Sequence, residues 1–291
     1  MGHRQILICF FLLTLVPLSA KAFPPASPAG GNYLVLDGVD DYAVLDFKTF
    51  GVLLPKGIDE FTVEAWVYPT TPLDKDTYAA VLSQQVQINV VNGDQEGWED
   101  DKKRIDWQKG DLILMLRAHL DIGGGGAVTP FRPVALPPNQ WHHIAYQAKG
   151  RETATIVNDF VHILPQSTTL AHDLSEFKRP KDFTLGGFGK KIEFHPGYFW
   201  GSFAGYIDEV RISTTARYNV GKDGFTPRNK FKKDKETLAL WHFDEPGGRQ
   251  IFSDASGNSH HLVGENGART SIPLAVEVKG KLATTWGRLK Q

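Results

Sequence analysis

Hydrophobic and polar residues alternate over most of the chain, and long helical repeats are absent. The stretch Phe61–Pro69 shows the alternation most clearly, with one apolar face made of Phe61, Val63, Ala65 and Val67. Further strands are expected at Tyr33–Leu36, Tyr42–Phe47, Ala79–Ser83, Gln87–Val91, Leu112–Ala118, His142–Ala148, Thr153–Val157, Val161–Leu164, Phe183–Leu185, Gly205–Ile212 and Leu238–Phe243. Many short alternating strands separated by turns predict an all-β fold, a two-sheet antiparallel β-sandwich of the jelly-roll type.

The first 22 residues differ from the rest of the chain. Arg4 precedes the apolar run ILICFFLLTLV, and Ala20 and Ala22 follow it in an A-x-A pattern. This is the layout of a secretory signal peptide, and the run is short for a bilayer span. We therefore expect a cleaved signal peptide at 1–22 and a secreted product, extracellular or periplasmic, without membrane insertion after cleavage. The remainder divides into a Pro/Ala/Gly linker at 23–31, the sandwich at 32–265 and a C-terminal tail at 266–291.

Charge and cysteine content narrow the possible chemistry. Without residues 1–22 the chain has 30 basic and 33 acidic side chains, a net charge of about −3 that gives no attraction to nucleic acid. Cys9 is the only cysteine and lies in the signal peptide, so the mature chain has no disulfide, thiol nucleophile or Cys-ligated zinc. The fold must therefore be stabilised by its hydrophobic core, and a bound metal ion is the other available source of stability.

Five stretches, in order, resemble the laminin-G-like modules of the concanavalin A-like lectin/glucanase superfamily. They are LDGVDDYAVLD, FTVEAWVYP, WHHIA, VNDF and GYIDEVRIS. The resemblance covers residues 30–245 and implies a concanavalin A-like sandwich, a fold that does not by itself define a function. The segment that starts at Trp241 resembles the usual opening of such a module. It either closes this sandwich or begins an incomplete second one, and the few remaining residues favour closure.

The turn after the first strand raises the question of a metal, because it carries Asp37, Asp40 and Asp41. In GYIDEVRIS, alternation places four residues on one face, expected to be the core face: Tyr206, Asp208, Val210 and Ile212. A buried carboxylate needs hydrogen-bond donors or a cation. The resemblance implies a structural calcium held by Asp37, the Gly38 carbonyl and Asp208. The alternative is that Asp208 accepts backbone hydrogen bonds, while Asp40 and Asp41 only shape the turn.

Catalytic patterns are absent from the sequence. Retaining glycoside hydrolysis needs two carboxyl groups about 5–5.5 Å apart. Glucanase relatives place them on a strand of the type E-x-D-x-x-E, which does not occur here. Glu64 is the only carboxylate within FTVEAWVYP, and neither G-x-S-x-G nor H-E-x-x-H is found. A glycoside hydrolase is therefore the weakest of three alternatives.

The favoured alternative is a non-catalytic module that binds carbohydrate at the cell surface or in the extracellular matrix. Sugar sites combine aromatic platforms with polar groups that fix hydroxyls. The candidate residues are Trp98 and Trp107 in a long polar loop, His195, Tyr198 and Trp200 in HPGYFW, and Glu64, Trp66 and Tyr68 on one strand face. The second alternative is protein–protein adhesion or surface display, in which the same aromatic residues contact an extracellular protein.

Overall fold

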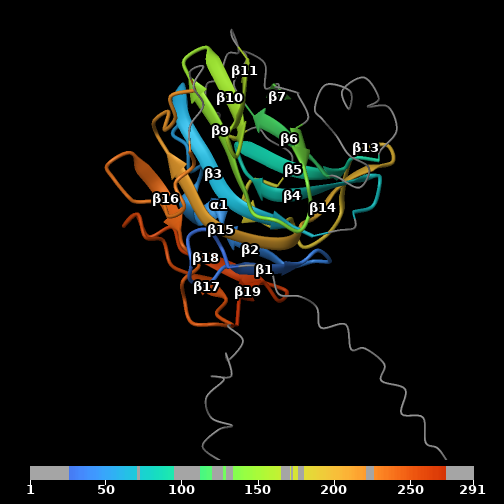
Figure 1. The fold of residues 1–291 in the computed structure, drawn as a ribbon. Helices are drawn as coiled ribbons and strands as arrows, with labels where there is room; N and C mark the ends of the chain where they lie inside the picture. Colours follow the sequence, from blue (N-terminus) through green and yellow to red (C-terminus); the bar gives the residue numbers. More distant parts are fainter. Residues whose placement is uncertain are drawn as a thin grey trace, which may run out of the picture.

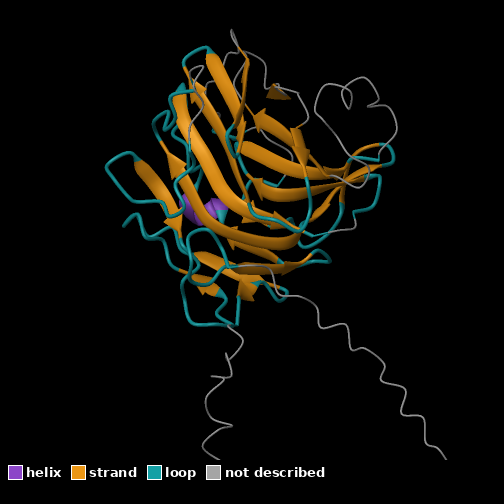
Figure 2. Cartoon of the chain, viewed as in Figure 1, coloured by secondary structure: helices purple, strands orange, loops and turns teal. Residues whose placement is uncertain are grey.

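The computed structural model describes residues 26–70, 73–94, 112–119, 127–128, 134–164, 171, 173–175, 180–220 and 226–272. Two β-sheets face each other across a shared core (Figure 1), and strands form nearly all of the regular structure (Figure 2). The predicted all-β, two-sheet sandwich is confirmed. The expected signal peptide lies outside the described residues. No helix within the described ranges has both the length and the apolar character needed to cross a bilayer.

The first sheet has eight strands, and its long central pair is β3 and β15. Its order is β11 (Phe160–Leu164), β10 (Glu152–Val157), β9 (His142–Lys149), β3 (Glu60–Pro69), β15 (Ala204–Ser213), β1 (Leu34–Asp37) and β19 (Arg269–Thr270), with β16 (Thr237–Trp241) also beside β15. All of these pairings are antiparallel. The turn at Asn158 between β10 and β11 has φ 54°, the left-handed conformation that asparagine tolerates.

The second sheet has eleven strands and is mixed, because β14 (Tyr198–Ser202) runs parallel to β4 (Thr77–Ser83). Its main path is β17 (Ile251–Phe252), β18 (Leu262–Glu265), β2 (Tyr42–Leu45), β12 (Phe183–Leu185), β4, β5 (Val86–Asn92), β6 (Leu112–His119) and β7 (Ala127–Val128). Two further strands join it, β13 (Ile192–His195) beside β14 and β8 (Val134–Leu136) beside β6. A four-residue helix, α1 (Phe47–Phe50), follows β2 and is capped by the Asp46 carboxylate, which accepts from Thr49 N–H at 2.9 Å.

The inner faces of the two sheets form one apolar core. The predicted inward face of β3 is confirmed, since Phe61, Val63, Ala65 and Val67 all belong to this core. Near its centre the Trp241 ring stacks on Phe183 with 5.2 Å between centroids, and its indole N–H donates to the His260 carbonyl at 2.7 Å. Burying such large rings removes apolar area from water, which contributes about 25 cal/mol per Å² to stability.

The predicted face of β15 is wrong in its first half. Ile207, Val210 and Ile212 lie in the core, whereas Tyr206 contacts aromatic rings on the outer face. The cause is a β-bulge between Asp208 and Arg211, where Glu209 has φ 51°. A bulge inserts an unpaired residue and so reverses the alternation that follows it.

Both ends of the described chain pack onto the sandwich. Ser27, in the expected linker, is buried and its hydroxyl donates to Asp208. Residues 269–270 of the expected tail form β19 beside β1. The segment that starts at Trp241 closes this domain, because its strands β17 and β18 join the second sheet and β19 joins the first. The boundaries at 31 and 265 therefore cut through the folded unit.

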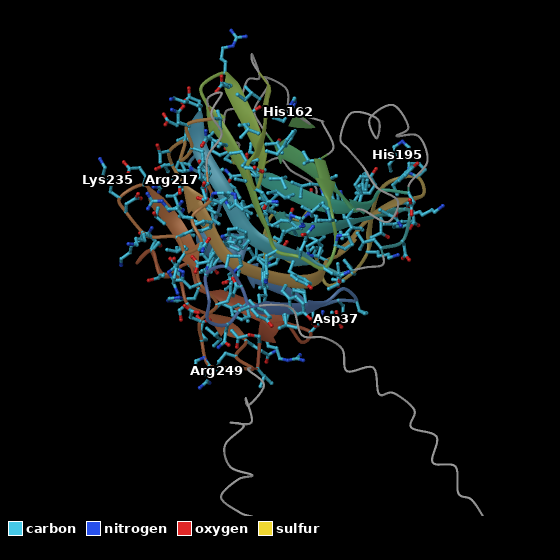
Figure 3. The ribbon with its side chains drawn as sticks, viewed as in Figure 1. Asp37, His162, His195, Arg217, Lys235 and Arg249 are labelled. Carbon is cyan, nitrogen blue, oxygen red and sulfur yellow. The ribbon has the colours of Figure 1, made fainter. Side chains whose placement is uncertain are left out.

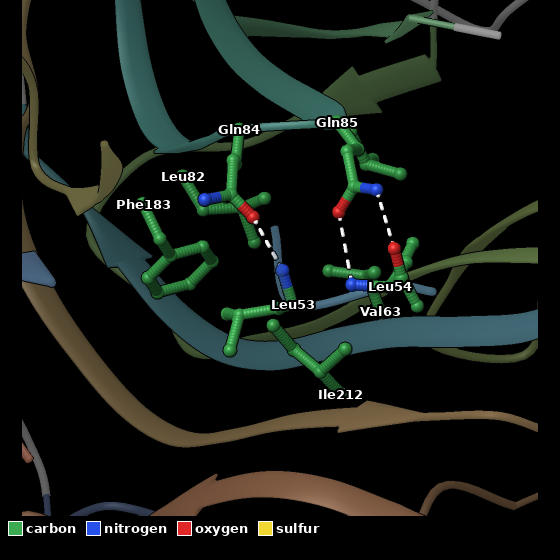
Figure 4. A pocket seen from close by; sticks show the side chains of 9 residues that line it. Leu53, Leu54, Val63, Leu82, Gln84, Gln85, Phe183 and Ile212 are labelled. Atoms are coloured by element: carbon green, nitrogen blue, oxygen red, sulfur yellow. Dashed lines mark hydrogen bonds between the residues drawn. The ribbon is translucent and has the colours of Figure 1, made fainter. Parts of the chain in front are cut away.

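One pocket lies inside the core, between the end of β4 and the segment after α1 (Figure 4). The side-chain amides of Gln84 and Gln85 close it by bonding the backbone of Leu53 and Leu54, with N···O distances of 2.6–2.9 Å. The remaining lining is mostly apolar. Since these amides are used by the chain's own backbone, the pocket belongs to the packing of the core.

Candidate functional site

The hairpin of β13 and β14 brings together three of the predicted site residues. Trp200 is buried and stacks on Phe194, with 5.0 Å between ring centroids and 15° between planes. Tyr198 is 37% exposed at the end of the hairpin. The exposed imidazole of His195 lies 5.8 Å from its ring. Trp200 therefore supports the hairpin from behind, while Tyr198 and His195 face the solvent.

Local sequence explains why this hairpin holds its shape. Gly197 has φ 78°, a conformation that a glycine adopts at no steric cost, and its N–H donates to the Glu193 carboxylate at 3.1 Å. Tyr78 on β4 contacts the edges of Phe194 and Tyr198, which ties the hairpin to the second sheet. The hairpin thus presents one exposed phenol and one imidazole on a rigid aromatic base. That combination suits stacking on an apolar sugar face together with hydrogen bonds to hydroxyls.

Two further predicted residues, Trp98 and Trp107, lie outside the described residues. The remaining three, Glu64, Trp66 and Tyr68, lie on the outer face of β3 as alternation predicts. Glu64 and Trp66 are nevertheless covered by the segment that follows β15, which we call the cover segment (described residues 214–220 and 226–236). The indole N–H of Trp66 donates to the Arg228 carbonyl of this segment at 3.1 Å. In this conformation neither residue offers a surface to a sugar.

Glu64 anchors the cover segment through a buried polar network. Its carboxylate lies 2.6 Å from the Arg211 guanidinium and 3.2 Å from His143 Nε2, and it accepts from the Tyr218 hydroxyl. Arg211 also lies 4.7 Å from the Phe231 ring centroid. Burial raises the pKa of Glu64, but the hydrogen bond from His143 and the charge of Arg211 outweigh it and hold that pKa below its usual value. The ionised pair thus fastens the cover segment to the first sheet.

Sequence reasoning missed the partners of Glu64 as a group. Alternation does place Glu64, His143 and Arg211 on the outer face. They also lie on three neighbouring strands, so their side chains come close together. An outward Glu beside an outward Arg was the available signal for an ion pair. Tyr218, which completes the network, comes from a segment with no strand pattern.

The predicted calcium site is not assembled as the resemblance implied. In the β1–β15 pairing Asp37 lies opposite Ala204, while Leu34 lies opposite Ile207. Asp208 is therefore four residues along β15 from the position opposite Asp37, a separation of roughly 13 Å at about 3.3 Å per residue. The antiparallel register places Asp37 and Gly38 at one end of the pairing and Asp208 at the other, so the three cannot share one ion.

Asp208 lies beneath the N-terminal segment, away from the aspartate turn. It is fully buried and accepts from the Ser27 hydroxyl and from Glu209 N–H, the latter at 2.8 Å. Burial raises the pKa of Asp208 to about 8, and the nearby Glu209 and Asp244 carboxylates add to the shift. The prediction that Asp208 is buried is confirmed, and the hydrogen-bond donors required by the alternative interpretation are present.

The three aspartates of the turn do come together. Asp37, Asp40 and Asp41 each offer a carboxylate oxygen, and these oxygens lie within 4.8 Å of one another. Two hydrogen bonds order the group, Asp37 N–H to Asp41 Oδ2 at 3.1 Å and Val39 N–H to Asp37 Oδ1 at 2.7 Å. Burial and the neighbouring Asp37 raise the pKa of Asp41. Hard oxygen donors that repel each other fit a calcium ion chemically.

Figure 3 shows that Asp37, His195 and Arg217 lie in separate parts of the molecule.

Comparison with known proteins defines the class of this chain. Residues 37–219 match the laminin G-like family model of the concanavalin A-like lectin/glucanases superfamily. The chain therefore belongs to this superfamily. A search of curated protein sequences finds no match.

Solved structures with a similar fold include a candidate carbohydrate-binding protein from Bacteroides ovatus ATCC 8483, at 15% identity and TM-score 0.51 over 84% of this chain and 61% of that one. This chain thus spans less than two thirds of that protein, and the likeness shows a shared fold. A pentraxin from Limulus polyphemus matches at 12% identity and TM-score 0.39, over 80% and 94% of the two chains. Domains LG4-5 of the mouse laminin α1 chain match at 12% identity and TM-score 0.37, over 72% and 46%.

Proposed function

We propose that this protein is an exported, non-catalytic module that recognises carbohydrate through the β13–β14 hairpin. The observation that carries the proposal is the exposed Tyr198, held beside His195 on a stacked base of buried rings. A fixed aromatic face loses little side-chain entropy when a sugar stacks on it. The superfamily includes lectins, and the similar Bacteroides ovatus protein carries a carbohydrate-binding description, which agrees with this ligand class.

The non-catalytic part of the proposal is supported by the environment of Glu64. This carboxylate is buried and paired with Arg211, so it has neither the exposure nor the free partner that acid catalysis at a sugar requires. We therefore propose that the chain binds glycans of the cell surface or the extracellular matrix and does not cleave them.

A glycan array followed by titration with the best ligand tests the hairpin. We expect Tyr198→Ala to weaken binding about tenfold, equivalent to about 1.4 kcal/mol, because the stacking ring is lost. Tyr198→Phe keeps the ring and should retain most of the affinity. Phe160→Ala is the matched control, since Phe160 is 50% exposed on the separate β10–β11 hairpin.

Three results would contradict this proposal in different ways. Release of reducing ends from a polysaccharide would show a glycoside hydrolase. Absence of glycan binding together with a protein partner would show the adhesion alternative. Equal glycan affinity of wild type and Tyr198→Ala would show that the hairpin is not the site.

We also propose a structural calcium at the turn, where Asp37, Asp40 and Asp41 would hold it. Bound calcium would supply positive charge that relieves repulsion among the three carboxylates. Because β1 and β2 flank this turn and belong to different sheets, ordering it would stabilise the link between the sheets.

Thermal unfolding with calcium and with EDTA tests this site. At a calcium concentration about 100 times the Kd, we expect the free energy of unfolding to rise by about 2.7 kcal/mol. Asp37→Asn/Asp41→Asn should remove the calcium effect, whereas Asp159→Asn in the exposed β10–β11 turn should keep it. Identical melting in calcium and EDTA would rule out the structural calcium and leave the carboxylates as turn formers.

A further inference from the structure

Four aromatic rings from separate parts of the chain form a closed circle on the outer face of the first sheet. We call Tyr33, Tyr68, Trp141 and Tyr206 the four-ring cluster. Tyr33 contacts Tyr206 and Trp141, and Tyr68 contacts the same two rings. Neighbouring centroids lie 5.1–5.6 Å apart with planes at 61–69°, the edge-to-face geometry that aromatic rings prefer.

Strand register builds this cluster. Tyr206 on β15 lies directly opposite Tyr68 on β3, and β1, which begins just after Tyr33, flanks β15 on its other side (Figure 1). Trp141 stands immediately before β9, the other neighbour of β3. The bulge after Asp208 lets Tyr206 face outward while the second half of β15 keeps apolar residues in the core. The cluster therefore depends on the bulge that follows Asp208 in β15.

The cluster carries three phenol hydroxyls that have no hydrogen-bond partner within the described part of the chain. Across the described residues, none of Tyr33, Tyr68 and Tyr206 has a hydrogen bond through its hydroxyl, and none of these oxygens is among the buried polar atoms without a partner. The rings are mostly buried, yet the hydroxyls therefore reach solvent. Burial and the neighbouring phenols Tyr206 and Tyr68 raise the pKa of Tyr33, which agrees with oxygens that lie close together.

We propose that the four-ring cluster is a second carbohydrate-binding surface, which takes a neutral sugar residue of a glycan. The half-buried edges of Trp141 and Tyr206 offer apolar contact to sugar C–H groups, and the three hydroxyls can donate to or accept from sugar hydroxyls. The cluster contains no charged side chain, so it has nothing to pair with a carboxylate, sulfate or sialic acid group. A ligand rich in hydroxyls and without charge matches this chemistry best.

This inference shares the ligand class of the proposed function but uses different residues. The hairpin rings lie on β13 and β14 of the second sheet, whereas the cluster lies on the first sheet. Each surface can therefore be removed without touching the other. Two surfaces on one module would raise avidity for a polymer that reaches both, without any new contact.

The test is binding of wild type and variants to an array of neutral and charged glycans, followed by titration with neutral gluco-, manno- and xylo-oligosaccharides. We expect Tyr206→Phe and Tyr33→Phe each to weaken binding of a neutral oligosaccharide about 3- to 10-fold, because each removes one hydroxyl and keeps its ring. Tyr42→Phe removes a half-buried phenol on β2 of the second sheet and should leave binding unchanged. The melting temperature of each variant shows that its fold is intact.

The outcomes separate this inference from the proposed function. Loss of affinity in Tyr206→Phe with none in Tyr198→Ala supports the cluster and overturns the hairpin. Loss in Tyr198→Ala with full affinity in Tyr206→Phe and Tyr33→Phe overturns the cluster and leaves the hairpin. Binding restricted to charged glycans also overturns the cluster, and absence of any glycan binding overturns both.

Discussion

Arg211→Met is expected to lower the free energy of unfolding by about 3–5 kcal/mol, because it leaves the buried Glu64 carboxylate without its counter-charge. Glu64 is fully buried and the Arg211 side chain is 6% exposed, so water cannot replace the lost partner. Methionine preserves much of the apolar contact with Phe231, which isolates the charge. Urea unfolding measured by fluorescence gives the change, and a domain of this size should also lose several degrees in melting temperature.

Two controls define what this loss means. Lys56→Met removes an ion pair between Asp173 and a lysine that is 64% exposed, and should change stability by no more than about 1 kcal/mol. Glu64→Gln/Arg211→Met removes both buried charges and should recover part of the loss, since no uncompensated charge remains. Wild-type stability in Arg211→Met would show that the network does not fasten the cover segment.

The strand pattern predicted most of the fold because each strand must bury one face. Phe183–Leu185 matches β12 residue for residue, and the expected bounds of β3 and β9 are off by only one residue. The pattern failed for elements that do not bury one complete face. β13 and β14 form a half-exposed hairpin at the edge of the second sheet, and β19 is two residues long.

The site was harder to predict than the fold because it depends on tertiary placement. Tyr68 could be placed outward from alternation, but the other three rings of the four-ring cluster come from three other segments. The bulge at Glu209 reverses the face of Tyr206, and a positive φ at a glutamate has no sequence signature. Likewise, burial of Trp66 depends on a cover segment without regular structure. Alternation assigns a side chain to a face, but it does not say what lies over that face.

Asp208→Asn is expected to raise the free energy of unfolding at pH 8 by about 2–5 kcal/mol. When the wild type folds at this pH, the Asp208 carboxylate must either stay ionised while buried or take up a proton, and asparagine removes both costs. Burial is the main cause that raises the pKa of Asp208 to about 8, against an ordinary value of 3.8. The asparagine oxygen can still accept from Glu209 N–H, and its amide N–H can donate to the Ser27 hydroxyl oxygen in place of the bond from Ser27. The measurement is urea unfolding in EDTA at intervals from pH 4 to pH 8.5.

The sign of the pH dependence distinguishes this effect from a simple packing change. Between pH 4 and pH 8 the folded state holds the Asp208 proton more tightly than the unfolded state, so this group makes wild-type stability fall as pH rises. Asp208→Asn lacks that fall, so its gain in free energy of unfolding over wild type should be near zero at pH 4 and largest near pH 8.

Asp254→Asn is the control with the opposite expected sign. Burial raises the pKa of Asp254, but hydrogen bonds from Ser256, Leu240 and His260 hold it below its usual value, so this variant should be less stable than wild type at neutral pH. A difference between wild type and Asp208→Asn that stays constant from pH 4 to pH 8.5 would mean that Asp208 is ionised throughout in the folded protein.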